Sequence, residues 1–128
     1  MKKVFLLFLI YLVVLIPSVN AQQLSLQNLI GKWEAPEGGG LEVMDSAHIY
    51  LTYGTDKKQV VSYSFDFSKT PAWFDFSVKD SATTIHMKSL LLFNTADEVQ
   101  WQVFEDGVRP VQFSTDKGDA ILILKRKR

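Results

Sequence analysis

Residues 61–78, with the sequence VSYSFDFSKTPAWFDFSV, decide the fold of this chain. Large apolar side chains alternate with small or polar ones on both sides of residues 69–71, Lys-Thr-Pro. A period of two is typical of a strand with one buried face, and a proline beside polar residues marks a turn. The stretch therefore predicts two antiparallel strands joined by that turn. The expected apolar faces consist of Val61, Tyr63, Phe65 and Phe67 on the first strand and of Phe74, Phe76 and Val78 on the second.

Short runs of the same kind follow one another along the rest of the chain. In residues 99–103, Val99, Trp101 and Val103 alternate with two glutamines that we place on a wet face. Ahead of the strands, residues 24–31 suit one or two helical turns that end at Gly31. About eight strands are expected in all, and the remaining runs are residues 41–44, 49–53, 85–93 and 120–125, with turn residues between them.

Eight sequential strands with one apolar face each close into an up-and-down barrel or stack as a sandwich. Nearly every link is short enough for a hairpin, whereas a sandwich needs longer crossing connections. We therefore predict an all-β protein, a small antiparallel up-and-down β-barrel after a short N-terminal helical turn. The glycine-rich residues 36–40 are expected to form a flexible loop.

The first 21 residues have the three parts of a secretory signal peptide. Lys2 and Lys3 precede an apolar run over residues 4–16, and Pro17 and the small residue Ala21 follow it. The run is 13 residues long, whereas a membrane span needs about 20. We therefore expect cleavage after residue 21, a barrel domain over residues 22–128, no stable membrane insertion, and export to a periplasm or to the medium.

Composition narrows the possible partners of the exported domain. Loss of Lys2 and Lys3 leaves 12 basic against 14 acidic residues, a net charge of −2, and four of the basic residues form the C-terminal run 125–128. Nucleic-acid binding calls for a broad basic face, so we do not expect it. The basic tail is either a contact for polyanions or a solvated strand end. The chain has no cysteine, so its core must hold it together, and we expect a monomer.

Gly31, Lys32 and Trp33, after the helical turn, resemble the Gly-x-Trp signature of lipocalin-like barrels. The resemblance implies that Trp33 plugs the closed end of the barrel. It also implies a basic residue on the last strand against that tryptophan, and Arg126, in phase with Leu122 and Leu124, is the matching residue.

Three further segments resemble a family of small exported bacterial domains of unassigned function that are thought to be lipocalin-like. The resemblance supports a fold and an extracytoplasmic location more than a function. Its segments here are Pro-Ala-Trp-Phe-Asp at 71–75, Arg-Pro-Val-Gln-Phe at 109–113 and Leu-Ile-Leu-Lys-Arg at 122–126, and the structural signature is Gly31, Trp33, Asp75, Arg109, Pro110, Phe113 and Arg126.

Thirteen aromatic residues lie between positions 33 and 113, more than closure of such a barrel needs. They either line a cavity for a small apolar or amphipathic ligand or fill the interior themselves. Tyr63 and Arg109 are the candidate polar anchors of such a ligand. The candidate ligand-binding residues are Tyr63, Phe65, Phe67, Phe74, Phe76, Trp101 and Arg109.

No metal or cofactor is predicted, because the two histidines, His48 and His86, fall on the polar phases of separate strands. Paired carboxylates are the remaining route to catalysis. Asp66 and Asp75 flank the proline turn, and Glu105 stands beside Asp106 in a later turn. The alternative is structural: these carboxylates are wet-face or turn residues, and Asp75 pairs with Arg109.

Three functions therefore stay open. The first is an exported, non-catalytic, lipocalin-like binding module for a small apolar or amphipathic ligand. The second is a protein-interaction or inhibitor-like scaffold that uses the loops at residues 36–40 and 106–110 and the outward-facing Trp73. The third is a carboxylate-dependent hydrolase.

Overall fold

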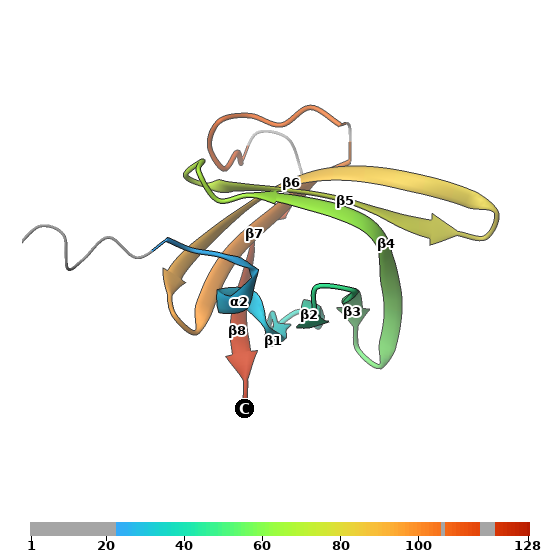
Figure 1. Cartoon of the computed structure of the whole chain (residues 1–128), viewed down its shortest axis with the longest axis horizontal. Helices are drawn as coiled ribbons and strands as arrows, with labels where there is room; N and C mark the ends of the chain where they lie inside the picture. Colours follow the sequence, from blue (N-terminus) through green and yellow to red (C-terminus); the bar gives the residue numbers. More distant parts are fainter. Residues whose placement is uncertain (1–22, 106, 116–119) are drawn as a thin grey trace, which may run out of the picture.

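The chain forms a closed antiparallel barrel of eight strands, which confirms the predicted fold class (Figure 1). Each strand pairs with the next, and β8 pairs with β1. The computed structural model describes residues 23–105, 107–115 and 120–128, so the predicted signal peptide and the cut before Gln22 lie outside the described residues. The elements are α2 (Leu26–Leu29), β1 (Gly31–Glu34), β2 (Gly39–Asp45), β3 (His48–Tyr53), β4 (Asp56–Asp66), β5 (Ala72–Asp80), β6 (Thr83–Thr95), β7 (Glu98–Phe104) and β8 (Leu122–Lys127).

The predicted helical turn is the single turn α2, in which the Ser25 amide donates to Asn28 Oδ1 at 2.9 Å. Gly31 does not end this helix but begins β1, with φ at +137°. A Cβ on that glycine would lie 2.8 Å from Nη1 of Arg126. Glycine is therefore needed here for the close approach of an arginine and for a backbone conformation that other residues rarely adopt.

Part of the loop expected at residues 36–40 is strand. Gly39 and Gly40 belong to β2 and pair with Tyr53 and Thr52 of β3. A Cβ on Gly40 would lie 2.1 Å from the Trp33 carbonyl oxygen of β1. The glycine run thus lets two strands pack closely. A glycine-rich composition fits either a flexible loop or such a close approach, so the sequence alone does not tell them apart.

Strand β4 contains a bulge that corrects the predicted apolar face. Val60 pairs with Val78 and Ser62 pairs with Ser77, so Val61 is the extra residue. Val61 is 50% exposed and Val60 is 5% exposed, which places Val60 in the interior instead of Val61. Beyond the bulge the predicted phase holds, because Tyr63 and Phe65 lie opposite Phe76 and Phe74. Phe67 follows the end of β4 and stacks on Phe65, with ring centroids 5.2 Å apart.

The pairing between β3 and β4 is short. It runs from Tyr50 opposite Gln59 to Tyr53 opposite Asp56. Over residues 60–66, β4 pairs with β5 alone among the described residues. The β2–β3 turn reaches this part of β4 through one side chain, since the Tyr63 hydroxyl donates to the Ser46 carbonyl oxygen at 2.5 Å. The barrel is therefore closed at one end of β4 and leaves a strand edge open at the other.

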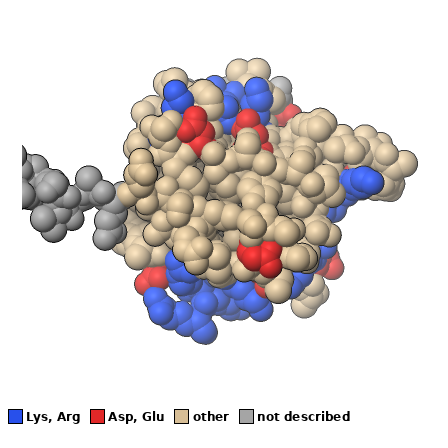
Figure 2. All heavy atoms as spheres, in the orientation of Figure 1, with Lys and Arg blue, Asp and Glu red and all other residues tan. Residues whose placement is uncertain are grey.

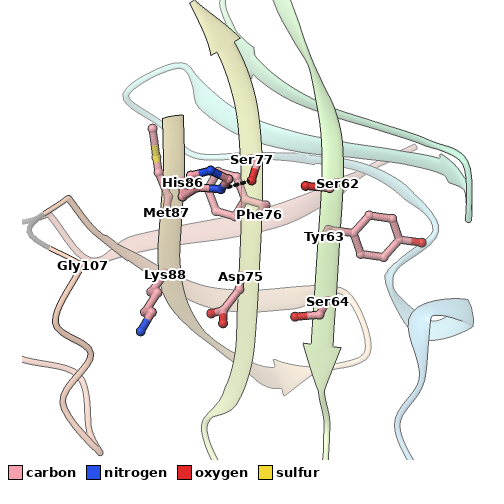
Figure 3. Close-up of a pocket in the computed structure, with 10 residues that line it drawn as sticks. All are labelled: Ser62, Tyr63, Ser64, Asp75, Phe76, Ser77, His86, Met87, Lys88 and Gly107. Atoms are coloured by element: carbon pink, nitrogen blue, oxygen red, sulfur yellow. Dashed lines mark hydrogen bonds between the residues drawn. The ribbon is translucent and has the colours of Figure 1, made fainter. Parts of the chain in front are cut away.

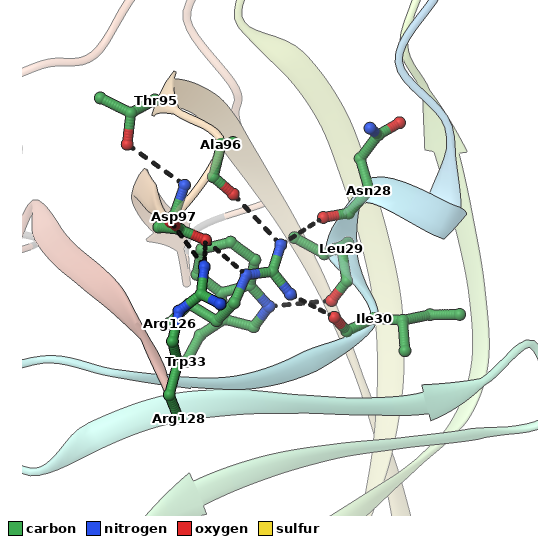
Figure 4. Close-up of polar contacts among 9 residues, drawn as sticks. All are labelled: Asn28, Leu29, Ile30, Trp33, Thr95, Ala96, Asp97, Arg126 and Arg128. Atoms are coloured by element: carbon green, nitrogen blue, oxygen red, sulfur yellow. Dashed lines mark hydrogen bonds and ion pairs between the residues drawn. The ribbon is translucent and has the colours of Figure 1, made fainter.

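The end of the barrel beside α2 is closed by Trp33 and Arg126, as the resemblance implies (Figure 4). The two residues face each other across β1 and β8, and the guanidinium carbon lies 4.3 Å from the buried indole ring. The indole Nε1 donates to the Leu29 carbonyl at 2.8 Å. The guanidinium donates to the carbonyls of Ile30, Asn28 and Ala96 and to the carboxylate of Asp97.

Basic side chains gather where β8 ends, at the lower edge of the molecule in Figure 2. Most of them are paired. Lys127 lies 2.8 Å from a carboxylate oxygen of Glu34, and Arg128 lies 2.8 Å from Asp97. Hydrogen bonds from Arg128 and then Arg126 hold the pKa of Asp97 below its ordinary value. These pairs favour the second reading of the basic tail, a strand end secured by acidic neighbours.

Candidate functional site

The predicted lining aromatics meet inside the barrel, where they pack against one another. Phe65 and Phe74 stack with their centroids 4.2 Å apart, and Phe76 lies 4.8 Å from Phe74. Trp101 lies 6.0 to 6.2 Å from both phenylalanines of β5, and its Nε1 donates to Ser89 Oγ at 2.9 Å. Of the predicted lining rings, Phe76 borders a hollow beside β4, β5 and β6, and Phe67 borders a small hollow of about 60 Å³. The close ring contacts of Phe65, Phe74 and Trp101 favour a filled interior over a cavity for an apolar ligand.

Residues 107–115 of the β7–β8 connection fold back over the outer face of the sheet (Figure 1). We call these residues the arm. Gln102, on the outward phase of β7, donates from Nε2 to the Ser114 carbonyl at 2.6 Å and accepts from the Ser114 amide at 2.9 Å. Gln102 and its cross-strand neighbour Leu90 are both 0% exposed. The predicted wet face at Gln102 is therefore wrong, because the arm covers it.

Replacement of Gln102 by methionine should release the arm. The variant loses both hydrogen bonds and leaves the Ser114 amide and carbonyl without these partners, so we expect a loss of about 2 kcal/mol in the free energy of unfolding. Limited proteolysis should also cut the arm faster. Gln100→Met, on the same strand face, is the matched control and should change neither readout. Equal proteolysis of the two variants would contradict the arm's attachment through Gln102.

Arg109 provides the second attachment of the arm. Its side chain is 9% exposed, forms an ion pair with Asp75 and lies 3.9 Å from the Trp73 ring centroid. The Arg109–Asp75 pair expected from the sequence is present. Arg109 is therefore on the outer face and is no anchor for a ligand inside the barrel. Pro110 and Phe113 of the signature lie half-buried in the same arm.

A groove of about 470 Å³ lies on the outer face of β4, β5 and β6, beside the arm at Gly107 (Figure 3). Tyr63 is also at its border, but its side chain points away from the groove. Three strands supply two polar side chains each, because outward residues of neighbouring strands stand side by side. These are Ser62 and Ser64 of β4, Asp75 and Ser77 of β5, and His86 and Lys88 of β6.

The groove offers hydrogen-bond donors from Lys88 and from the serine hydroxyls. Ser77 Oγ lies 2.6 Å from His86 Nδ1, so the tautomer in which the serine donates leaves the proton on Nε2. Among the described residues, Lys88 forms no ion pair and the hydroxyls of Ser62 and Ser64 have no hydrogen-bond partner. Among the described lining residues the carboxylate of Asp75 and the amine of Lys88 are the two charged groups, and Asp75 is paired with Arg109 beside the groove. Lys88 is therefore the lining charge that has no ion-pair partner among the described residues.

The predicted carboxylates Asp66 and Asp75 each have another partner. Asp75 is paired with Arg109, and hydrogen bonds from the Ser68 hydroxyl and amide hold the pKa of Asp66 below its ordinary value. A general acid needs the opposite shift. Glu105 directly follows β7, three strands along the sheet from Asp66 at the end of β4, and Asp106 lies outside the described residues.

Both histidines are exposed, as expected. His48 Nδ1 lies 2.8 Å from Asp45 Oδ1, and its hydrogen bond holds the pKa of that carboxyl below its ordinary value. No group of three or more metal-ligating side chains occurs in the part of the chain that the structure describes. Within the same residues, no helix has the length and apolarity to cross a membrane.

Neither family models nor curated proteins nor solved structures give a match to this chain.

Proposed function

We propose that this protein is an exported, non-catalytic binding module that holds a small anion in the groove on its outer face. The observation that carries the proposal is a hollow of about 470 Å³ lined by Lys88, which has no ion-pair partner within the part of the chain that the structure describes. Binding sites for small ligands have volumes of about 300 to 1,000 Å³, so the hollow is large enough for a carboxylate or phosphate compound. The exported location comes from the predicted signal peptide.

The ligand's charge follows from the chemistry of the groove. An oxyanion accepts several hydrogen bonds at once, and Lys88, His86 and the serines of β4 offer donors on one face. Bonds to an ionised group are about twice as strong as neutral ones. A cation would face Lys88 with only Asp75 to compensate, and that carboxylate is already paired with Arg109. An anion is therefore favoured.

We infer a lipocalin-like lineage for the barrel from the contact between Trp33 and Arg126, which is the pairing that the resemblance implies. The binding mode differs from an interior site, since the aromatic rings occupy that space. The barrel then serves as a rigid support for the groove on its outer face, and this groove is independent of the barrel interior.

The test uses inorganic phosphate and succinate as probes, followed by NMR of the His86 ring and the Lys88 side-chain amine. We expect both groups to shift on addition of either probe. Lys88→Gln should weaken binding by about tenfold or more, because it removes a charge-assisted hydrogen bond. Lys125→Gln, an exposed lysine of β8 with no ion pair among the described residues, should leave affinity unchanged. Equal binding by the Lys88 variant and the native protein would reject the groove as the site.

A further inference from the structure

Ser77 of β5 and His86 of β6 form a hydrogen-bonded pair in the wall of the groove (Figure 3). The two residues lie directly opposite each other in the β5–β6 register, and Ser77 Oγ lies 2.6 Å from His86 Nδ1. Ser77 is buried, whereas His86 is exposed, so a proton from solvent reaches the ring without any movement of the sheet. The pair therefore places an ionisable group inside the proposed anion site.

Protonation of His86 changes what the groove offers to a ligand. A neutral imidazole carries one N–H and an imidazolium carries two, so the charged ring has one more donor whichever tautomer is present at first. In the tautomer in which the serine donates, the hydrogen bond must then reverse, because Nδ1 becomes the donor and Ser77 Oγ the acceptor. The serine hydroxyl hydrogen is free to turn towards a ligand. From that tautomer, one proton adds a positive charge and also releases a donor beside it.

The charges around this pair favour an anion next to the charged ring. Lys88 stands two residues from His86 on the same strand face, about 6.8 Å along β6. An anion between the two is attracted by both when the ring is charged and by Lys88 alone when the ring is neutral. The strand on the other side, β4, contributes the neutral hydroxyls of the groove. The charged residues on or beside this face are Asp75 and Lys79 of β5, Lys88 of β6, Glu105 after β7 and Arg109 of the arm.

These charges couple ligand binding to protonation. Three cationic side chains stand against two carboxylates around the pair, and the imidazolium raises the excess from one positive charge to two. An anion therefore binds the charged form of the ring more tightly than the neutral form. By reciprocity, its binding draws a proton onto His86. Histidine side chains change charge between about pH 5 and pH 8, so the affinity should be highest at acidic pH and fall as the pH rises through this range.

We propose that the groove takes up a proton at His86 together with its anion. The protein then holds the anion in an acidic medium and releases it as the medium becomes alkaline. This inference rests on the anion site proposed above and adds the regulation of that site.

The experiment measures sulfate binding to the purified protein by calorimetry at about pH 5.5 and about pH 8, because sulfate keeps the same charge over the range in which histidine titrates. The affinity should be about tenfold higher at the lower pH. At neutral pH, titrations in buffers with different heats of ionisation should show proton uptake on binding.

Two histidine variants assign the effect to one ring. His86→Gln keeps a side-chain donor but cannot gain a charge, so it should lose both the pH dependence and the proton uptake. His48→Gln changes the other histidine, which is bonded to Asp45 outside the groove, and should keep both.

Ser77→Ala tests the reversal of the hydrogen bond. It should weaken sulfate binding about fivefold at the lower pH and leave it unchanged at the higher pH, because the hydroxyl hydrogen turns to the ligand only when the ring is charged. An equal loss at both pH values would contradict the reversal.

Three results would overturn the coupling while the anion site stands: sulfate binding that Lys88→Gln weakens but that does not vary with pH, pH dependence that persists in His86→Gln, or pH dependence that is lost in His48→Gln. Absence of sulfate binding at both pH values would overturn the anion site and the coupling together.

Discussion

Replacement of Arg126 by methionine is expected to lower the free energy of unfolding by about 3 kcal/mol, from the lost cation–π contact and hydrogen bonds. The guanidinium joins three separate parts of the chain, because it bonds to α2 at Asn28, to the β6–β7 turn at Ala96 and to the ring of Trp33. Methionine keeps the packing over the ring but supplies no donor. Denaturant unfolding at neutral pH measures the effect.

Two companion variants separate the effect of the guanidinium's several hydrogen bonds from the effect of its positive charge. Arg126→Lys retains the charge but cannot reach the carbonyls of Ile30, Asn28 and Ala96 together, so it should recover less than half of the loss. Lys125→Met changes an exposed neighbour on β8 and should alter stability by less than about 0.5 kcal/mol. If Arg126→Met and Lys125→Met unfolded at the same denaturant concentration, the closed end of the barrel would not depend on the contacts of the Arg126 guanidinium.

Replacement of Gly40 by alanine should be at least as damaging, with a loss of about 3 to 4 kcal/mol. The added Cβ would lie 2.1 Å from the Trp33 carbonyl oxygen and 2.9 Å from Thr52 Oγ1. The first of these atoms is backbone, so β1 and β2 must move apart at the residue that plugs the barrel. Unfolding by urea, followed through tryptophan fluorescence, measures the change.

Gly39→Ala is the matched control for this prediction. A Cβ at Gly39 would lie 3.8 Å from Leu122 and 4.0 Å from Tyr53, which are ordinary contact distances. The two variants remove the same backbone freedom, so their difference isolates the steric contact with Trp33. Equal stability of the two would show that the close approach of β1 and β2 is not required.

The architecture was predictable from the sequence because the period-two pattern and the short links are local features. Val99, Trp101 and Val103 face inward as expected, and all eight strands occur in the order of the chain. The contact of Trp33 with Arg126 was also predictable, but only through the resemblance. Composition and local patterns do not reveal that a residue of the first strand contacts a residue of the last strand.

The errors have local causes that a pattern does not reveal. The bulge at Val61 exchanges the roles of two adjacent valines, and the sequence Val60-Val61 gives no sign of which one is extra. The burial of Gln102 depends on the arm, whose path over the sheet is a tertiary contact. The groove was missed for the same reason, since Ser62, Ser77 and His86 read as solvated polar residues when each strand is considered alone.

We propose that ligands bind on the outer face and not among the interior rings. Octyl phosphate tests this claim directly, because it offers an anionic head and an apolar chain in one molecule. An NMR titration should shift the His86 ring and the Lys88 side chain while the Trp101 indole resonance stays in place. A shift of the Trp101 indole with His86 and Lys88 unchanged would contradict binding on the outer face and would place the site in the barrel interior.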